Sequence, residues 1–100
     1  MLISVSTQLY DEARLARLRP LLEKDDALGV EIFPEWQLTR YEGAQRQALP
    51  WLAGRAITLH GPYWDIDPCF APDEPEFALF LKYWHKTLAL AAQLQARYVV

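Results

Sequence analysis

The sequence predicts an α/β fold in which parallel strands alternate with helices. Four short segments rich in β-branched and other apolar residues have the length and composition of buried strands, at residues 2–6, 28–33, 55–60 and 98–100. The stretches between them carry helical spacing or helix-end signals. Because strand–helix–strand alternation favours parallel strands joined by right-handed crossovers, we expect the helices to cover the sheet.

The first two predicted helices differ in how clearly the sequence marks them. Residues 10–24 carry leucines at helical spacing, and Pro20 predicts either a kink or the start of a second short turn. Residues 38–48 are polar with only a weak apolar stripe, and Pro50 is expected to follow the end of that helix.

The longest predicted helix runs from about residue 74 to residue 95. Asp73 followed by Glu76 resembles a capping box, and Pro75 suits the first turn because its missing N–H removes no helical hydrogen bond. The expected buried stripe consists of Phe77, Phe80, Leu81, Trp84, Leu88 and Ala91.

The predicted order β-α-β-α-β-α-β matches the first part of a (β/α)8 barrel. Such a barrel needs at least about 200 residues, so this chain would supply about three and a half of its eight units. We therefore expect residues 1–100 to be a single domain, the N-terminal segment of a barrel that continues past residue 100. An open sheet is the alternative.

Composition narrows the class of protein. The chain is 52% apolar and 23% charged, which allows a buried core, and its net charge of −3 argues against a nucleic-acid partner. The basic residues, Arg55 among them, are scattered and are expected on solvated surfaces. The single cysteine, Cys69, excludes an internal disulfide or thiolate zinc site, and no leader or membrane-spanning run is visible. We expect a soluble, cytoplasmic protein.

Polar residues gather where the predicted strands end. In parallel α/β folds, ligands bind at the carboxyl ends of the strands. At the end of the first predicted strand these residues are Ser6, Thr7 and Gln8. At the end of the second they are Glu31, Glu35 and Trp36, and at the end of the third they are His60, Tyr63, Trp64, Asp65 and Asp67. Gly61 is expected to let the backbone turn sharply after His60, so that a long loop crosses the mouth of the site.

Each candidate also has a structural interpretation. His60 suits a divalent metal or a sugar hydroxyl, but a single histidine at a strand end also serves as a hydrogen-bonded structural residue. Glu31 lies within an apolar strand and needs a cation or hydrogen-bond donors. The aromatic residues Trp36, Tyr63 and Trp64 form either a platform for a sugar or packing under the loop.

The remaining polar candidates favour structural roles. Glu35 is expected to be solvated or at a helix entry, and Asp65 and Asp67 are expected in turns. His85 lies in the middle of the long helix, away from the strand ends, and is expected on the surface. None of the motifs GxGxxG, P-loop, HExxH or GxSxG occurs in the sequence.

Three runs, LGVEIF, ITLHGPYWDI and HKTLALAAQLQARYVV, together resemble the N-terminal part of the xylose-isomerase-like TIM barrels. That superfamily includes sugar and sugar-phosphate isomerases and epimerases and the AP-endonuclease branch. Typical features are V-E-[IL] in the second strand, H-[GA]-P-[YF] at the third, and an Ala- and Leu-rich helix leading into [RK]-Y-V-V. The sequence departs from the common Leu-Gly-Ala before the fourth strand, where it has Gln95 in place of glycine.

The resemblance implies a divalent metal ion (Mn, Mg, Co or Zn) at the mouth of the barrel. In the isomerase branch the main metal ligands come from later strands, which would lie beyond Val100. In the nuclease branch the histidine after the third strand, here His60, is a zinc ligand, and a second histidine follows the fourth strand.

Three functions follow as hypotheses. The first is a metal-dependent sugar or sugar-phosphate isomerase or epimerase, in which Glu31, His60, Trp36, Tyr63 and Trp64 bind a small sugar substrate. The second is a zinc-dependent phosphodiesterase for abasic DNA that uses His60 as a ligand. The third is a non-catalytic binding protein on the same barrel. The isolated segment is expected to be inactive, and its exposed strand edges would favour a homo-oligomer.

Overall fold

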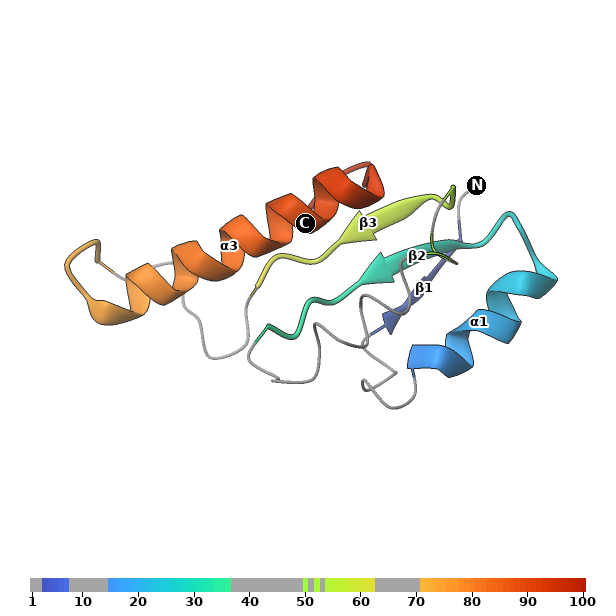
Figure 1. The fold of residues 1–100 in the computed structure, drawn as a ribbon, viewed down its shortest axis with the longest axis horizontal. Coiled ribbons are helices and arrows are strands. Elements are labelled where there is room, and N and C mark those ends of the chain that lie inside the picture. The colour runs from blue at the N-terminus through green and yellow to red at the C-terminus, as the bar shows by residue number, and fades with distance from the viewer. Residues whose placement is uncertain (1–2, 8–14, 37–49, 51, 53, 63–70) are drawn as a thin grey trace.

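The structure, a computed structural model, describes residues 3–7, 15–36, 50, 52, 54–62 and 71–100. The elements follow in the order β1 (Ser4–Ser6), α1 (Leu15–Lys24), β2 (Gly29–Ile32), β3 (Ile57–Leu59) and α3 (Pro75–Leu94) (Figure 1). The strands lie side by side in the order β1-β2-β3, and both neighbouring pairs are parallel. The predicted parallel α/β class is confirmed. No barrel closes within the described residues.

The end of the described chain adds a fourth parallel row to the sheet. Val99 forms a parallel bridge with Leu59. The Leu59 N–H donates to the carbonyl of Tyr98 at 3.1 Å, and the Val100 N–H donates to the carbonyl of Leu59 at 2.8 Å. Residues 98–100 therefore pair with β3, as the sequence predicts.

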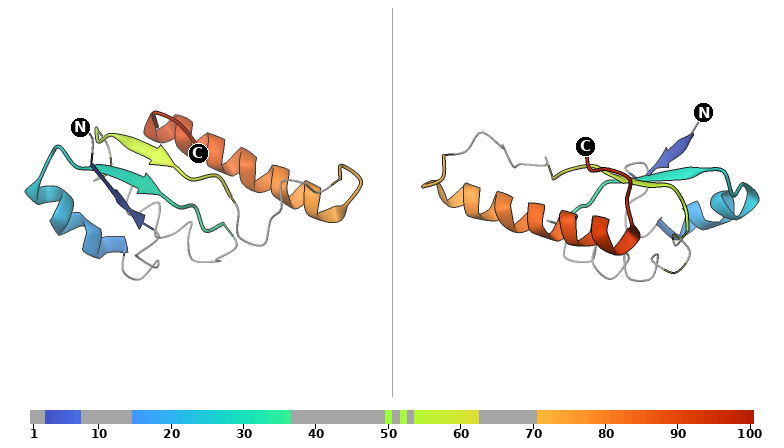
Figure 2. Two further views of the ribbon diagram at one scale, coloured as in Figure 1. Left: turned by 180° about the vertical axis from the view of Figure 1, so that it is seen from behind. Right: turned by 90° about the horizontal axis from the view of Figure 1, so that it is seen from above.

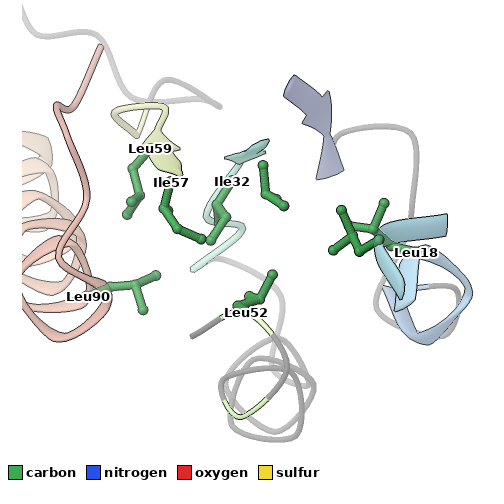
Figure 3. Packing of buried hydrophobic residues seen from close by; sticks show 8 residues of the cluster. Leu18, Ile32, Leu52, Ile57, Leu59 and Leu90 are labelled. Atoms are coloured by element: carbon green, nitrogen blue, oxygen red, sulfur yellow. The ribbon is translucent and has the colours of Figure 1, made fainter. Parts of the chain in front are cut away.

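Both described helices cover the same face of the sheet. One hydrophobic cluster joins α1, β2, β3, Leu52 and α3 (Figure 3). Its buried members are Leu18, Leu22, Val30, Ile32, Leu52, Ile57, Leu59 and Leu90. The strand residues of this cluster alternate with the polar ones, so they point to one side, where α1 and α3 lie (Figure 2).

Sequential strand order explains this one-sided arrangement. A right-handed crossover places its helix on a face that depends on the direction in which the sheet grows. Since β1, β2, β3 and residues 98–100 follow one another without a reversal, the two crossovers with described helices, α1 and α3, fall on the same side. A doubly wound sheet would need a reversal of strand order, and the described strands contain none.

The α1 helix tolerates its internal proline. Pro20 lies inside Leu15–Lys24 and is exposed, and the element continues through it as one helix without a second start. The predicted residues 10–14 of this helix and the whole predicted helix at 38–48 lie outside the described residues.

The ends of α3 correct one prediction and refine another. The helix begins with Glu74 as its N-cap residue and makes no side-chain cap hydrogen bond, so the predicted capping box of Asp73 and Glu76 is wrong. Pro75 does occupy the first turn. At the other end Gln95 adopts the left-handed conformation with φ of 52°, which glycine would adopt with less strain.

The buried side of α3 differs from the predicted stripe. Thr87 and Leu90 are the buried residues, whereas Leu88 is 51% exposed and Leu81 is 38% exposed. The prediction counted hydrophobic residues, whereas one of the two buried positions is a threonine. Thr87 can be buried because its hydroxyl donates to the carbonyl of Tyr83 at 2.9 Å and also accepts a hydrogen bond from Trp36.

The side chain of Arg55 is largely buried, whereas the sequence predicted a solvated surface position. Its side chain is only 12% exposed. The guanidinium donates to the carbonyl oxygens of Asp25, at 3.0 Å, and of Leu28, at 3.3 Å, and also to that of Leu22. These carbonyls lie at the end of α1 and in the turn after it, so Arg55 adds side-chain hydrogen bonds to acceptors at the helix terminus, of which those of Leu22 and Asp25 also accept a backbone N–H.

Candidate functional site

Three polar side chains form one row across the sheet. The register pairs Ser6 with Glu31 and Glu31 with Thr58. Residues paired in this way point to the same face, here the face opposite α1 and α3. Parallel sheets are usually covered by apolar packing on both faces. Among the described residues, this polar row lies on the face that neither α1 nor α3 covers, and its member Thr58 is buried.

A second row lies one step closer to the carboxyl ends of the strands. Phe33 follows Glu31 by two residues and His60 follows Thr58 by two, so both continue the same face. Their rings are stacked, with centroids 4.4 Å apart and planes inclined by 20°. The His60 N–H donates to the carbonyl of Ile32 at 2.8 Å, which extends the ladder past β3. Glu31 and His60 are thus on neighbouring strands of one face, as expected.

The contacts of His60 define which ring nitrogen faces which partner. Its Nδ1 lies 2.9 Å from the carbonyl oxygen of Gly61. A carbonyl oxygen only accepts, so Nδ1 must carry the proton in this hydrogen bond. In the neutral imidazole Nε2 is then the acceptor, the arrangement typical of histidines that bind a metal ion or accept a proton.

Thr7 holds the carboxyl ends of the first two strands together. It is 7% exposed, and its Oγ1 accepts a hydrogen bond of 2.9 Å from the backbone N–H of Phe33. The hydroxyl thus satisfies a backbone donor just beyond β2. This bond holds the backbone of Phe33, whose ring is stacked on that of His60.

The indole nitrogen of Trp36 forms a hydrogen bond within the protein. The indole Nε1–H donates to Thr87 Oγ1 at 2.8 Å, and the Lys86 ammonium lies 5.4 Å from the centroid of the ring. A sugar platform at Trp36 would therefore rely on the ring face alone, close to a cation. The same contacts anchor the segment after β2 to the inner side of α3.

Gly61 has a different role from the predicted sharp turn. Its N–H donates to the carbonyl of Val100 at 2.7 Å, which continues the sheet pairing, and its φ is not positive. A Cβ at this position would lie 2.9 Å from the Trp84 ring and 3.1 Å from the Val100 carbonyl oxygen. Glycine is needed because α3 and the fourth row approach the backbone closely.

The other predicted candidates are placed only in part. Glu35 is half-buried just beyond β2, and His85 is exposed on α3, which confirms its expected surface position. Several predicted residues lie outside the described residues: Gln8, Tyr63, Trp64, Asp65, Asp67 and Cys69. Sequence reasoning missed Phe33 and Thr87 because it searched for polar or titratable residues at strand ends. The spacing of two from Glu31 to Phe33 was the available signal.

The described segments do not form a complete metal site. No three His, Cys, Asp or Glu side chains among them lie together in a way that could hold an ion. His60 and Glu31 could each offer a donor atom, but further ligands would have to come from other parts of the protein. None of the described helices is both long and apolar enough to cross a membrane.

Comparison of the chain with models of protein families, with curated proteins and with solved structures gives no match.

Proposed function

We propose that this chain is the N-terminal part of a (β/α)8 barrel that acts as a sugar or sugar-phosphate isomerase or epimerase. The observation that carries the proposal is the pair of rows on the helix-free face. Ser6, Glu31 and Thr58 form one row, and the Phe33–His60 stack lies above it at the carboxyl ends. In a barrel this face would be the interior, and its carboxyl end would be the mouth.

These residues suit the recognition of a polyhydroxylated substrate. A carboxylate such as Glu31 accepts hydrogen bonds from hydroxyl groups, and Ser6 and Thr58 can both donate and accept. His60, with its proton on Nδ1, offers an acceptor nitrogen to a substrate hydroxyl. Proton transfer next to a carbonyl needs a base of this kind within hydrogen-bond reach of the substrate. The described residues do not fit a metal ion by themselves, so the metal of the related enzymes enters no step here.

Glu31 and His60 have different expected roles. Glu31 lies deeper along the strands and would bind a hydroxyl, whereas His60 stands at the mouth and would orient the reacting end of the sugar. The zinc phosphodiesterase remains the second candidate because the Nδ1 hydrogen bond of His60 directs Nε2 outward from the Gly61 carbonyl, as in zinc-binding histidines. The net charge of −3 weighs against a DNA substrate.

Exchange of substrate hydrogen in D2O tests the proposal. The intact protein is incubated with a panel of aldoses, ketoses and their phosphates in D2O, with added Mn²⁺, Mg²⁺ or Co²⁺, and NMR detects deuterium on the carbon next to the carbonyl. We expect exchange with at least one sugar, and a loss of at least about tenfold in His60→Ala and Glu31→Gln. Glu23→Gln, an exposed carboxylate on α1, is the matched control.

The outcomes separate the candidate functions. Exchange that persists unchanged in His60→Ala and Glu31→Gln would contradict the assigned site. Absence of exchange with every sugar, together with cleavage of an abasic-site DNA duplex that needs Zn²⁺ and His60, would favour the phosphodiesterase. Absence of both activities in the intact protein would favour the non-catalytic binding protein.

A further inference from the structure

The polar row across the sheet has a fourth member. Leu59 faces Val99 where β3 pairs with residues 98–100. The residues that precede them, Thr58 and Tyr98, are therefore opposite each other. Val99 packs against the hydrophobic cluster on the helix side, and since side chains alternate along a strand, Tyr98 points to the other face, as its 58% exposure agrees. From β1 outward the row therefore consists of Ser6, Glu31, Thr58 and Tyr98.

Thr58 differs from the other buried threonines in its hydrogen bonds. The buried hydroxyl of Thr7 accepts from the backbone N–H of Phe33, and that of Thr87 accepts from the indole N–H of Trp36. Thr58 is only 5% exposed, yet none of the described residues forms a hydrogen bond with its hydroxyl. A buried hydroxyl without a partner destabilises a fold, so such a position is typical of a group that binds a ligand or an ordered water molecule.

Two longer polar side chains flank Thr58. Glu31 and Tyr98 each lie one strand away, and neighbouring strands are about 4.7–4.9 Å apart. Because threonine is shorter than either neighbour, a ligand hydroxyl placed above Thr58 would be within reach of all three groups. The Tyr98 side chain is exposed and makes no hydrogen bond to a described residue, so its ring can change rotamer and give a small group access to Thr58.

The chemistry of these three groups selects a neutral hydroxyl rather than a phosphate. An ionised carboxylate only accepts hydrogen bonds, whereas phenol and threonine hydroxyls both donate and accept, so one ligand hydroxyl can donate to Glu31 and accept from Tyr98 or Thr58. A phosphate would place negative charge beside Glu31, and no described cation pairs with that carboxylate. We infer that Glu31, Thr58 and Tyr98 form a subsite for neutral hydroxyl groups of a polyol, with Tyr98 as a further substrate-binding residue. The inference rests on the proposed function, because the subsite is part of the same face.

Thr58→Val tests whether the buried hydroxyl serves a ligand or the fold. Valine has nearly the same shape and lacks the hydroxyl, so the intact variant should melt no lower than the unmodified protein. Thr87→Val is the matched control: it removes the acceptor of the Trp36 indole and should melt lower by about 2–8 °C. A decrease in Thr58→Val as large as that in Thr87→Val would overturn the inference, because the hydroxyl would then have a structural partner.

Titration of the intact protein with ribitol, followed by NMR, tests the binding itself. Ribitol carries hydroxyl groups but no carbonyl, so its binding does not depend on the proposed proton transfer. Its addition should shift the signals of the Thr58 methyl group and the Tyr98 ring, and inorganic phosphate should leave them unchanged. Tyr98→Phe and Thr58→Val should each raise the Kd for ribitol about two- to tenfold, as expected for one lost hydrogen bond. Tyr83→Phe, a tyrosine on α3, is the matched control and should leave the Kd unchanged.

Failure of this inference is distinguishable from failure of the proposed function. Ribitol binding that both variants weaken, without deuterium exchange on any sugar, would support the subsite and contradict the isomerase. Exchange that requires His60, together with an unchanged Kd for ribitol in Tyr98→Phe and Thr58→Val, would overturn the subsite and leave the proposed function standing. The inference is also overturned if ribitol shifts neither the Thr58 nor the Tyr98 signals at any concentration, or if phosphate shifts them equally.

Discussion

The imidazole ring of His60 is stacked on the phenyl ring of Phe33, with the two centroids 4.4 Å apart. The stack joins the carboxyl ends of β2 and β3 on the helix-free face. Together with the hydrogen bond from Nδ1 to the Gly61 carbonyl, it holds the imidazole in one orientation. A candidate binding residue is thus positioned by an apolar neighbour and a backbone acceptor.

The stack has a spectroscopic signature. Ring protons of His60 lie over the Phe33 face, so their NMR signals should be displaced upfield in the unmodified chain. In Phe33→Leu they should return towards the position of a free imidazole. His85, exposed on α3, provides the internal control in the same spectrum. Unchanged His60 signals in Phe33→Leu would mean that the rings are not stacked in solution.

Thr87 is predicted to stabilise the segment after β2 through Trp36. In Thr87→Val the indole N–H loses its acceptor in a partly buried place, which should lower the free energy of unfolding by about 1–3 kcal/mol. Thr87→Ser keeps the hydroxyl and should lose less. Urea unfolding measures both variants, and the Trp36 indole N–H signal should move only in Thr87→Val. Equal stability of the two variants would contradict a role for the hydrogen bond.

Arg55 is predicted to stabilise the end of α1 at the amino end of β3. Arg55→Met removes hydrogen bonds to three backbone carbonyls and should cost about 2–3 kcal/mol. Arg19→Met removes a guanidinium that is 56% exposed and pairs only with Glu23 among its described contacts, so its cost should stay below about 1 kcal/mol. Thermal unfolding of both variants checks the difference. The interpretation fails if the two losses are alike.

A methyl group added at Gly61 is predicted to destabilise the fold. In Gly61→Ala the new Cβ would lie 2.9 Å from the Trp84 ring, which must move, and close to the Val100 carbonyl oxygen. The expected loss of stability is about 1–3 kcal/mol, as for overpacked sites. Gly54→Asn serves as the comparison for a substitution without a steric clash, because Gly54 has φ of 81° but open space around its Cβ. Combining Gly61→Ala with Trp84→Leu should recover part of the loss, and no recovery would argue against the Trp84 contact.

Local patterns were enough to predict the parallel sheet. The β-branched runs at 28–33 and 55–60 and the apolar run of the long helix have the periods of strands and helices, and the observed elements fall within the predicted ranges. The shared position of Glu31 and His60 was also predictable, because parallel strands bring their carboxyl ends to one edge.

The buried side of α3 could not be predicted from its own sequence. Both sides of this helix carry apolar residues, and counting them favoured Leu88 over Thr87. The choice depends on Trp36, which lies 51 residues away and supplies the donor for the buried hydroxyl. In the same way, Arg55 could not be distinguished from solvated arginines until the carbonyls of Leu22, Asp25 and Leu28 were seen to surround it.

Thus the sequence by itself determined which segments become strands and helices and that they pair in parallel, because these properties follow from neighbours a few residues apart. Only the tertiary structure decided the hydrogen-bond partners of Thr87 and Arg55, the stack of Phe33 on His60 and the close approach to Gly61. Each of these is a contact between residues distant in the chain, and its energy depends on geometry that no local pattern contains.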